Sequence, residues 1–203
     1  MSAKIVRITR NLGFDEVQSG AVSAIQAYKT QVMEWVIGPA KVLAAHLPRN
    51  TDHGMAILAL ELMFFEPHGQ FLNPATSGSR NKFCTAFDRF REYLKSHSQI
   101  LEDTDRLSSE KIYKWARCGL FHSSLLASDL LVDAVEFSGR PLAKNTVLEG
   151  WLVDPWLLLG CLENYLGKYV SEIEGNPSGI LATHFNSTFT TLFNEPLERF
   201  SKM

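Results

Sequence analysis

The sequence has few of the residues on which disulfide and metal scaffolds depend. Cysteine occurs three times in 203 residues, at Cys84, Cys118 and Cys161, and no C-x-x-C is present. An odd number of widely spaced cysteines excludes a disulfide framework or a cysteine zinc site and favours a reducing compartment. None of the six histidines forms an H-x-x-x-H or H-E-x-x-H pair. We therefore expect no metal and no cofactor.

Several other sequence signatures are also missing. No G-x-x-x-x-G-K-[ST], G-x-G-x-x-G or G-x-S-x-G motif occurs, which counts against P-loop, dinucleotide-binding and serine-hydrolase sites. No apolar run approaches the roughly 20 residues that span a bilayer. The first 17 residues, MSAKIVRITRNLGFDEV, lack the apolar core of a secretory signal. These absences predict a cytoplasmic protein with no membrane segment.

The composition is that of a folded globular protein. Hydrophobic residues make up 45% and charged residues 21% of the chain, with 20 Lys and Arg against 22 Asp and Glu. A net charge of -2 argues against broad, non-specific nucleic-acid binding but leaves room for a small site with local cations. Because no repeat or linker is visible, we expect residues 1–203 to form a single domain.

Apolar residues that recur every three or four positions predict a mainly α-helical fold. The first helix is expected to bend or split at Gly38-Pro39, because proline interrupts helical hydrogen bonding, and to end at Leu47-Pro48. Residues 67–81 are rich in Gly, Pro, Ser and Asn and are expected to form a loop. The expected helices cover about residues 15–46, 51–65, 80–97, a segment starting after residue 108 or 109, residues 155–174 and part of 184–200.

Three helix starts carry capping signals. Ser77 or Ser79 can cap the Phe-rich helix, and Ser108 or Ser109 can cap the next one. Asp154-Pro155 combines an N-cap aspartate with a proline at the first helical position. Before that point the helical period fails, and residues 132–137 and 147–153 are expected to form a β-hairpin around residues 139–141. The predicted fold is therefore a helical bundle with a small β-hairpin insert.

Two features of the expected core carry their own predictions. Glu61 interrupts a helix that is apolar nearly all round, so we expect its carboxylate to find a hydrogen bond or an exposed edge. The four tryptophans are expected to lie in the core; they are Trp35, Trp115, Trp151 and Trp156.

The stretch IYKWARCGLFHSSLL, residues 112–126, holds the strongest candidate for chemistry. Arg117 and His122 lie five positions apart in a largely apolar run. Histidine can exchange a proton near neutral pH, and arginine can hold a phosphate and offset charge that develops on it. Such a pair can cleave RNA without a metal, by activating the ribose 2′-hydroxyl against the neighbouring phosphate.

Spacing alone does not establish this pair. Arg91 and His97 show a similar separation, but on the charged side of a helix whose end His97 is expected to cap. On a regular α-helix, positions five apart point about 140° away from each other. Arg117 and His122 converge only if the helix ends or loosens, for example at Gly119, or if a second subunit completes the site. Alternatively, Arg117 pairs with Glu61 or another core carboxylate and His122 bonds a helix-end carbonyl.

The segment KIYKWARCGLFHSS resembles the motif helix of the HEPN superfamily (higher eukaryotes and prokaryotes nucleotide-binding domain). Arg117, Gly119, Leu120 and His122 match its Arg-x-Gly-Leu-x-His form. A looser similarity extends over about residues 50–175. The resemblance implies an up-and-down helical bundle, a homodimer with facing motif helices, and metal-independent endoribonuclease activity of the toxin–antitoxin or defence type.

The resemblance also implies roles for individual residues. Arg117 would hold the phosphate and the transition state, and His122 would transfer the proton. Lys114, Cys118 and Ser123 lie beside the motif and are candidates for substrate contact. Cys118 departs from the family pattern, because active members usually carry a polar residue directly after the arginine. An antitoxin or nucleotidyltransferase partner would be a separate chain. A catalytically silent dimerisation or protein-interaction module is the main alternative, and generic nucleotide binding is a weaker one.

Overall fold

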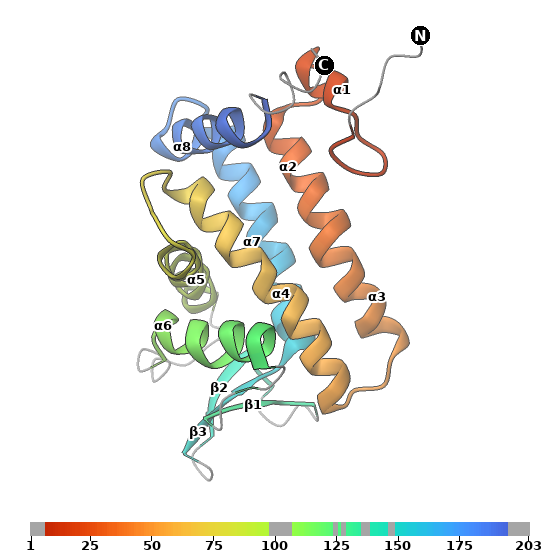
Figure 1. Ribbon diagram of the computed structural model, residues 1–203, viewed down its shortest axis with the longest axis vertical. Helices are drawn as coiled ribbons and strands as arrows, with labels where there is room; N and C mark the ends of the chain where they lie inside the picture. The colour runs from red at the N-terminus through yellow and green to blue at the C-terminus, as the bar shows by residue number, and fades with distance from the viewer. Residues whose placement is uncertain are drawn as a thin grey trace.

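The computed structural model describes residues 7–97, 107–123, 126, 129–134, 139–145 and 149–194 (Figure 1). The chain is mainly helical, as the sequence predicts, and it contains a small three-stranded sheet. The α-helices are α1 (Phe14–Gln18), α2 (Ala24–Val32), α3 (Gly38–His46), α4 (Thr51–Leu72), α5 (Ser79–Ser96), α6 (Ser109–Ile112), α7 (Pro155–Gly175) and α8 (Ile180–Phe189). The π-helical segments are η1 (Met33–Ile37), η3 (Tyr113–Ser123) and η4 (Thr190–Asn194), and the strands are β1 (Leu130–Val132), β2 (Leu142–Asn145) and β3 (Gly150–Val153).

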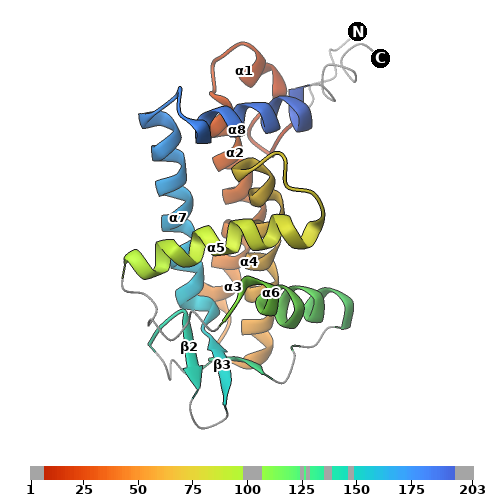
Figure 2. The same ribbon diagram turned by 90° about the vertical axis from the view of Figure 1, so that its left-hand side faces the viewer.

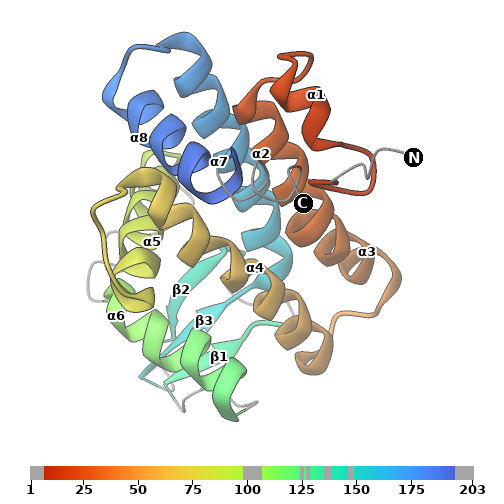
Figure 3. The ribbon, with the colours of Figure 1, turned by 45° about the horizontal axis from the view of Figure 1, so that its top comes forward.

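Three long helical rods run side by side, formed by α2–η1–α3, by α4 and by α7 (Figures 1 and 2). Helix α5, the α6–η3 segment and α8 lie across these rods, and the sheet lies at the end opposite α1 and α8 (Figure 2). Helix α4 lies between α3 and α5 and also contacts α7, α8 and η3 (Figure 3). Within the described ranges, no helix has both the length and the hydropathy required to cross a membrane.

Helix α4 is longer than its composition predicts. It continues through Pro67 to Leu72, so the expected loop at 67–81 is wrong for its first six residues. His68 and Phe71 are buried on this last part of the helix. Gly69 lets α5 pack closely, because a Cβ there would lie 1.8 Å from the carbonyl oxygen of Lys82. Tertiary packing therefore outweighs the local Pro and Gly signals.

The expected first helix is divided once, between α1 and α2. Gly20 has φ 78°, which ends α1, and the Ser23 side chain then caps α2 by accepting from the backbone N–H of Gln26. Helix α3 ends before Leu47, as predicted. At Gly38-Pro39 the backbone stays helical, and the irregular part is the π-helical η1 directly before it. Trp35 on η1 is 57% exposed, so its prediction as a core residue is wrong.

The capping predictions have mixed outcomes. Ser108 caps α6 through the backbone N–H of Lys111, and Asp154 caps α7 through that of Leu157, as expected. Gly78 is the N-cap of α5 and gives no side-chain bond, so neither Ser77 nor Ser79 has the predicted role. The last helix begins at Ile180, earlier than predicted, because residue 179 provides the N-cap.

The predicted hairpin between residues 132–137 and 147–153 is wrong in its first strand, because the antiparallel partner of the second strand lies at residues 142–145. Strands β2 and β3 pair antiparallel, with Ala143 opposite Leu152, and β1 adds parallel to β3 to give the order β1-β3-β2. The turn between the antiparallel strands therefore follows Asn145 rather than lying at 139–141. Residues 135–137 and 147–148, which were expected in strands, lie outside the described residues.

Candidate functional site around Arg117

The helix that carries the motif is wound as a π-helix from Tyr113 to Ser123. In this geometry each N–H bonds the carbonyl five residues back, so a turn takes more residues than the 3.6 of an α-helix. Backbone position 122 therefore points closer to the direction of Arg117 than the 140° separation on an α-helix allows. The loosening that the sequence requires is present, and it extends along the whole segment rather than at Gly119 alone. The side chains of His122 and Ser123 lie outside the described part of the structure.

Arg117 is held by two neighbours. Its Nη2 donates to Oε2 of Glu66 on α4 at 3.0 Å, and its guanidinium carbon lies 4.8 Å from the ring centroid of Phe121. The side chains of Arg117 and Glu66 are 25% and 27% exposed. The alternative of a carboxylate partner is thus correct in kind, but the partner is Glu66 and not Glu61. An ion pair this accessible contributes about 0–1 kcal/mol, so an incoming anion can replace the carboxylate.

These residues border a cavity of about 400 Å³, here called the Arg117 groove. Lys82 at the start of α5 adds a second cation, and its Nζ donates to Oε1 of Gln70 at 2.9 Å. Phe121 is 42% exposed, so its ring is accessible at the groove. The groove thus presents two cations, one carboxylate and an accessible aromatic ring. It is lined by Leu62, Met63, Glu66, Pro67, Gln70, Lys82, Arg117, Phe121 and Leu192.

Lys114 and Cys118 face a different hollow. They line a cavity of about 510 Å³ together with Arg80, Lys111 and Tyr113, on another side of the π-helix from Arg117. Cys118 is only partly buried, and burial, followed by the influence of Cys118, raises the pKa of Tyr113. The structure therefore separates the predicted residues: Arg117 belongs to one cavity, and Lys114 and Cys118 belong to another.

An apolar hollow continues the Arg117 groove along α4. It has a volume of about 290 Å³ and shares Met63, Pro67 and Leu192 with the groove. Trp35 lies at its far end and is the most exposed aromatic side chain among the described residues. Sequence reasoning missed this surface, because the periodic pattern that marks Trp35 as apolar does not tell which side of η1 is covered.

Glu61 lies elsewhere, in the core beneath α7. It is completely buried, and neither carboxylate oxygen has a hydrogen-bond partner among the described residues. Burial, reinforced by the nearby Asp154, holds the pKa of Glu61 well above its usual value, which favours the protonated form of the group. Both sequence expectations for Glu61, a hydrogen bond or an exposed edge, are therefore wrong.

The competing pair has structural roles. Arg91 donates to the carbonyl of Leu107 at 2.9 Å and forms an ion pair with Asp88. His97 is the C-cap residue of α5, and its Nδ1 lies 2.8 Å from the carbonyl oxygen of Tyr93. This confirms the predicted capping role of His97.

No group of three or more His, Cys, Asp or Glu side chains in the described ranges is arranged to hold a metal ion. Comparison of the chain with protein-family models, with curated proteins and with solved structures yields no match. The functional argument therefore depends on the geometry of the Arg117 groove and on the motif it contains.

Proposed function

We propose that the chain is a HEPN-like, metal-independent endoribonuclease that binds RNA in the Arg117 groove. One observation carries the proposal: the motif helix is π-wound, which turns backbone position 122 toward the direction of Arg117, and Arg117 lines a groove together with Lys82 and the exposed ring of Phe121. Long π-helical segments are rare, and π-turns are frequent at functional sites. The up-and-down bundle and the homodimer that the motif implies belong to the same proposal.

The proposed reaction is an internal transesterification of RNA. His122 removes the proton of a ribose 2′-hydroxyl, which attacks the adjacent phosphorus while the bond to the 5′-oxygen breaks. The departing 5′-oxygen takes a proton from a second imidazolium, supplied by His122 of another copy across the dimer. The products are a 2′,3′-cyclic phosphate and a 5′-hydroxyl, and no metal or cofactor takes part.

The described residues have matching roles in this reaction. Arg117 and Lys82 oppose the negative charge that grows on the phosphorane oxygens. Phe121 offers a face on which a base can stack, an interaction worth about 1–3 kcal/mol per base. In the absence of RNA, Arg117 is paired with Glu66. The RNA phosphate must displace the Glu66 carboxylate from the guanidinium.

A nuclease assay in EDTA tests the proposal. Wild-type protein is incubated with fluorescent mixed-sequence RNA beside Arg117→Ala and His122→Ala, with His97→Ala as the matched histidine control. We expect wild type and His97→Ala to cleave, both motif variants to lose at least about 100-fold in rate, and the products to carry cyclic phosphate ends. If folded wild type leaves the RNA intact at every protein concentration, or if the motif variants cleave as wild type does, the nuclease proposal fails.

A second candidate function is a catalytically silent dimerisation module. It is favoured by the apolar side chains that remain exposed beside the groove: Trp35 is 57%, Met63 47% and Leu192 40% exposed. A second copy of the chain is the proposed occupant, since the motif helix borders the same surface. Sedimentation of wild type and Trp35→Ser separates the two functions: a dimer that requires Trp35 but does not cleave RNA favours the silent module, and a monomeric wild type excludes it.

A further inference from the structure

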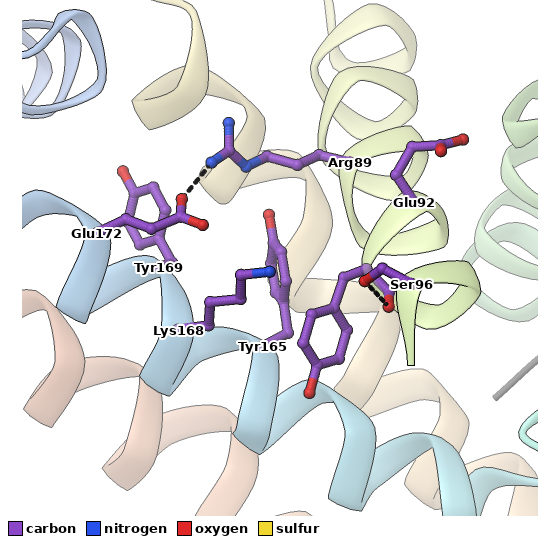
Figure 4. Close-up of a pocket in the computed structure, with 8 residues that line it drawn as sticks. Arg89, Glu92, Ser96, Tyr165, Lys168, Tyr169 and Glu172 are labelled. Atoms are coloured by element: carbon purple, nitrogen blue, oxygen red, sulfur yellow. Dashed lines mark hydrogen bonds and ion pairs between the residues drawn. The ribbon is translucent and has the colours of Figure 1, made fainter. Parts of the chain in front are cut away.

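A separate polar pocket of about 230 Å³ opens between α5 and α7 (Figure 4). Arg89 reaches into it from α5, and Lys168 and Glu172 extend from α7, with the Tyr165 hydroxyl directed toward the guanidinium of Arg89 (Figure 4). None of these residues belongs to the Arg117 groove. The pocket has a floor of buried tyrosine and a rim of exposed charges, which is the arrangement of a small-ligand site.

The pocket is lined by two cations, Arg89 and Lys168, and by two carboxylates, Glu92 and Glu172. Arg89 and Glu172 form an ion pair at 2.5 Å, and Glu92 on the rim is paired with Lys95 at 3.4 Å. The Lys168 ammonium has no carboxylate partner among the described residues and lies 5.6 Å from the ring centroid of Tyr93. Lys168 is therefore the lining cation that stays outside these ion pairs, and an anion is its complementary ligand.

The floor of the pocket is connected to the core by hydrogen bonds. Tyr165 hydroxyl lies 3.0 Å from Nε2 of His68, and Nδ1 of His68 lies 2.8 Å from the hydroxyl of Tyr28. All three side chains are buried. Burial lowers the pKa of His68 to about 3 and raises the pKa of both tyrosines, so His68 carries one N–H and each tyrosine keeps its proton.

The neutral His68 imidazole can form its hydrogen bonds to the two tyrosine hydroxyls in two ways. In the first, Tyr165 donates to Nε2, Nδ1–H donates to Tyr28, and the Tyr165 oxygen accepts from the pocket. In the second, Nε2–H donates to Tyr165, Tyr28 donates to Nδ1, and the Tyr165 proton points into the pocket. Both arrangements contain the same number of protons. The Arg89 guanidinium beside the Tyr165 oxygen favours the first arrangement in the free protein, and an anion in the pocket favours the second.

We propose that this pocket binds a small oxyanion, as a carboxylate or a phosphate group, between Lys168, Arg89 and the Tyr165 hydroxyl, and that binding converts His68 from the Nδ1–H to the Nε2–H tautomer. Arg89 and Lys168 touch the ligand in this arrangement, whereas His68 acts through Tyr165 and is a positioning residue. The proposal does not depend on RNA cleavage at the Arg117 groove.

An NMR titration of the full chain, labelled with ¹⁵N-histidine, tests the binding. Inorganic phosphate or acetate is added at pH 7 and constant ionic strength, to wild type, Lys168→Ala, Arg89→Ala and Lys41→Ala. Lys41→Ala is the matched control, because Lys41 forms an exposed ion pair with Glu163 away from the pocket. We expect saturable binding to wild type and Lys41→Ala, and at least about tenfold weaker binding to the other two, since a hydrogen bond to a charged group is lost.

The same spectra report the tautomer. Long-range ¹H–¹⁵N correlations of His68, assigned with His68→Gln, should show Nδ1–H in the free protein and Nε2–H at saturation. Tighter binding of phosphate identifies a phosphate-ester ligand, and equal or tighter binding of acetate identifies a carboxylate. The site is overturned if neither anion saturates, or if Lys168→Ala binds as Lys41→Ala does. Saturable binding that leaves the His68 tautomer unchanged overturns the coupling to His68.

Discussion

Nη2 of Arg117 lies 3.0 Å from Oε2 of Glu66, so the arginine that the motif assigns to RNA phosphate is held by a carboxylate of α4. Both side chains remain partly accessible. The pair therefore orients Arg117 at the edge of the groove without removing it from solvent, and Glu66 competes with any phosphate that enters. The effect of the Glu66 charge on phosphate binding can therefore be measured by substituting this residue.

The first prediction concerns this competition. Glu66→Gln removes the competing charge but keeps the size and hydrogen-bonding capacity of the side chain. We expect the affinity for RNA, and kcat/KM for cleavage, to rise about three- to tenfold, while the free energy of unfolding changes by less than about 1 kcal/mol. Fluorescence anisotropy with labelled RNA and urea unfolding measure the two quantities.

Glu163→Gln is the control for this experiment, because it removes the same charge from an exposed ion pair with Lys41. Its affinity for RNA should stay within about twofold of wild type. Weaker RNA binding by Glu66→Gln would mean that Glu66 positions Arg117 productively rather than competing with the phosphate.

Local signals in the sequence were sufficient where short-range chemistry decides the structure. Asp154-Pro155 predicts the start of α7, and Ser108 predicts the start of α6, because a cap depends on atoms within three residues. Such signals failed at Pro67 and Gly69, where contacts with α5 decide that the helix continues. A partner that is far away in the sequence has no local trace, so α4 was predicted too short.

The candidate site shows the same limit. The residues of KIYKWARCGLFHSS identify Arg117, but they do not show that the helix is π-wound or that Glu66, 51 positions earlier, is its partner. Lys114 and Cys118 are adjacent to Arg117 in sequence and yet line another cavity. Sequence proximity on a helix does not predict a shared face when the number of residues per turn differs from 3.6.

A second prediction follows from the buried imidazole of His68. Its pKa is about 3 in the folded protein and 6.5 in a model peptide, so the unfolded chain binds a proton that the folded chain does not. The contribution of the neutral His68 imidazole to the free energy of unfolding is fully present above pH 6.5 and is lost as the pH falls toward 3. At pH 5 we expect a loss of about 2 kcal/mol relative to pH 7, at 1.36 kcal/mol per pKa unit.

Urea unfolding at pH 7 and pH 5 measures this effect as a difference between wild type and His68→Gln. The variant lacks the titrating imidazole, while the other ionisable groups are common to both proteins. We also expect His68→Gln to be about 1–3 kcal/mol less stable at pH 7, because Tyr28 and Tyr165 lose well-placed hydrogen-bond partners. An equal pH dependence in the two proteins would show that His68 is protonated in the folded state.

Glu61 supports a third prediction, with the opposite sign. Its pKa is raised in the folded protein, so folding favours the protonated form. Glu61 destabilises the folded protein little below pH 4.5, the ordinary pKa of the group and its value in the unfolded chain. The destabilisation grows as the pH rises above this value. Glu61→Met fills a similar volume without a carboxylate, and we expect it to raise the free energy of unfolding by more than about 1 kcal/mol at pH 8 and by less at pH 5.

Glu163→Met is the control variant, because it changes an accessible carboxylate. It should change the free energy of unfolding by the same amount at pH 5 and at pH 8. Urea midpoints at pH 5 and pH 8 provide the measurement. Loss of stability in Glu61→Met at pH 8 would indicate that the carboxylate has a stabilising partner in solution.

A fourth prediction concerns the contact between α4 and α5. A Cβ at Gly69 would lie 1.8 Å from the carbonyl oxygen and 2.9 Å from the Cα of Lys82, which are backbone atoms that cannot rotate away. Gly69→Ala must therefore push the two helices apart, and we expect a loss of about 3 kcal/mol or more in the free energy of unfolding.

Gly167→Ala on α7 is the matched control, because a Cβ there meets no atom within 4 Å. The control should gain about 0.5–1 kcal/mol from the helix propensity of alanine. Lys82 also lines the Arg117 groove, so Gly69→Ala should lower RNA cleavage more than its loss of folded protein accounts for. Thermal unfolding and the nuclease assay on both variants measure these effects, and equal stability of the two alanine variants would contradict the close packing of α4 against α5.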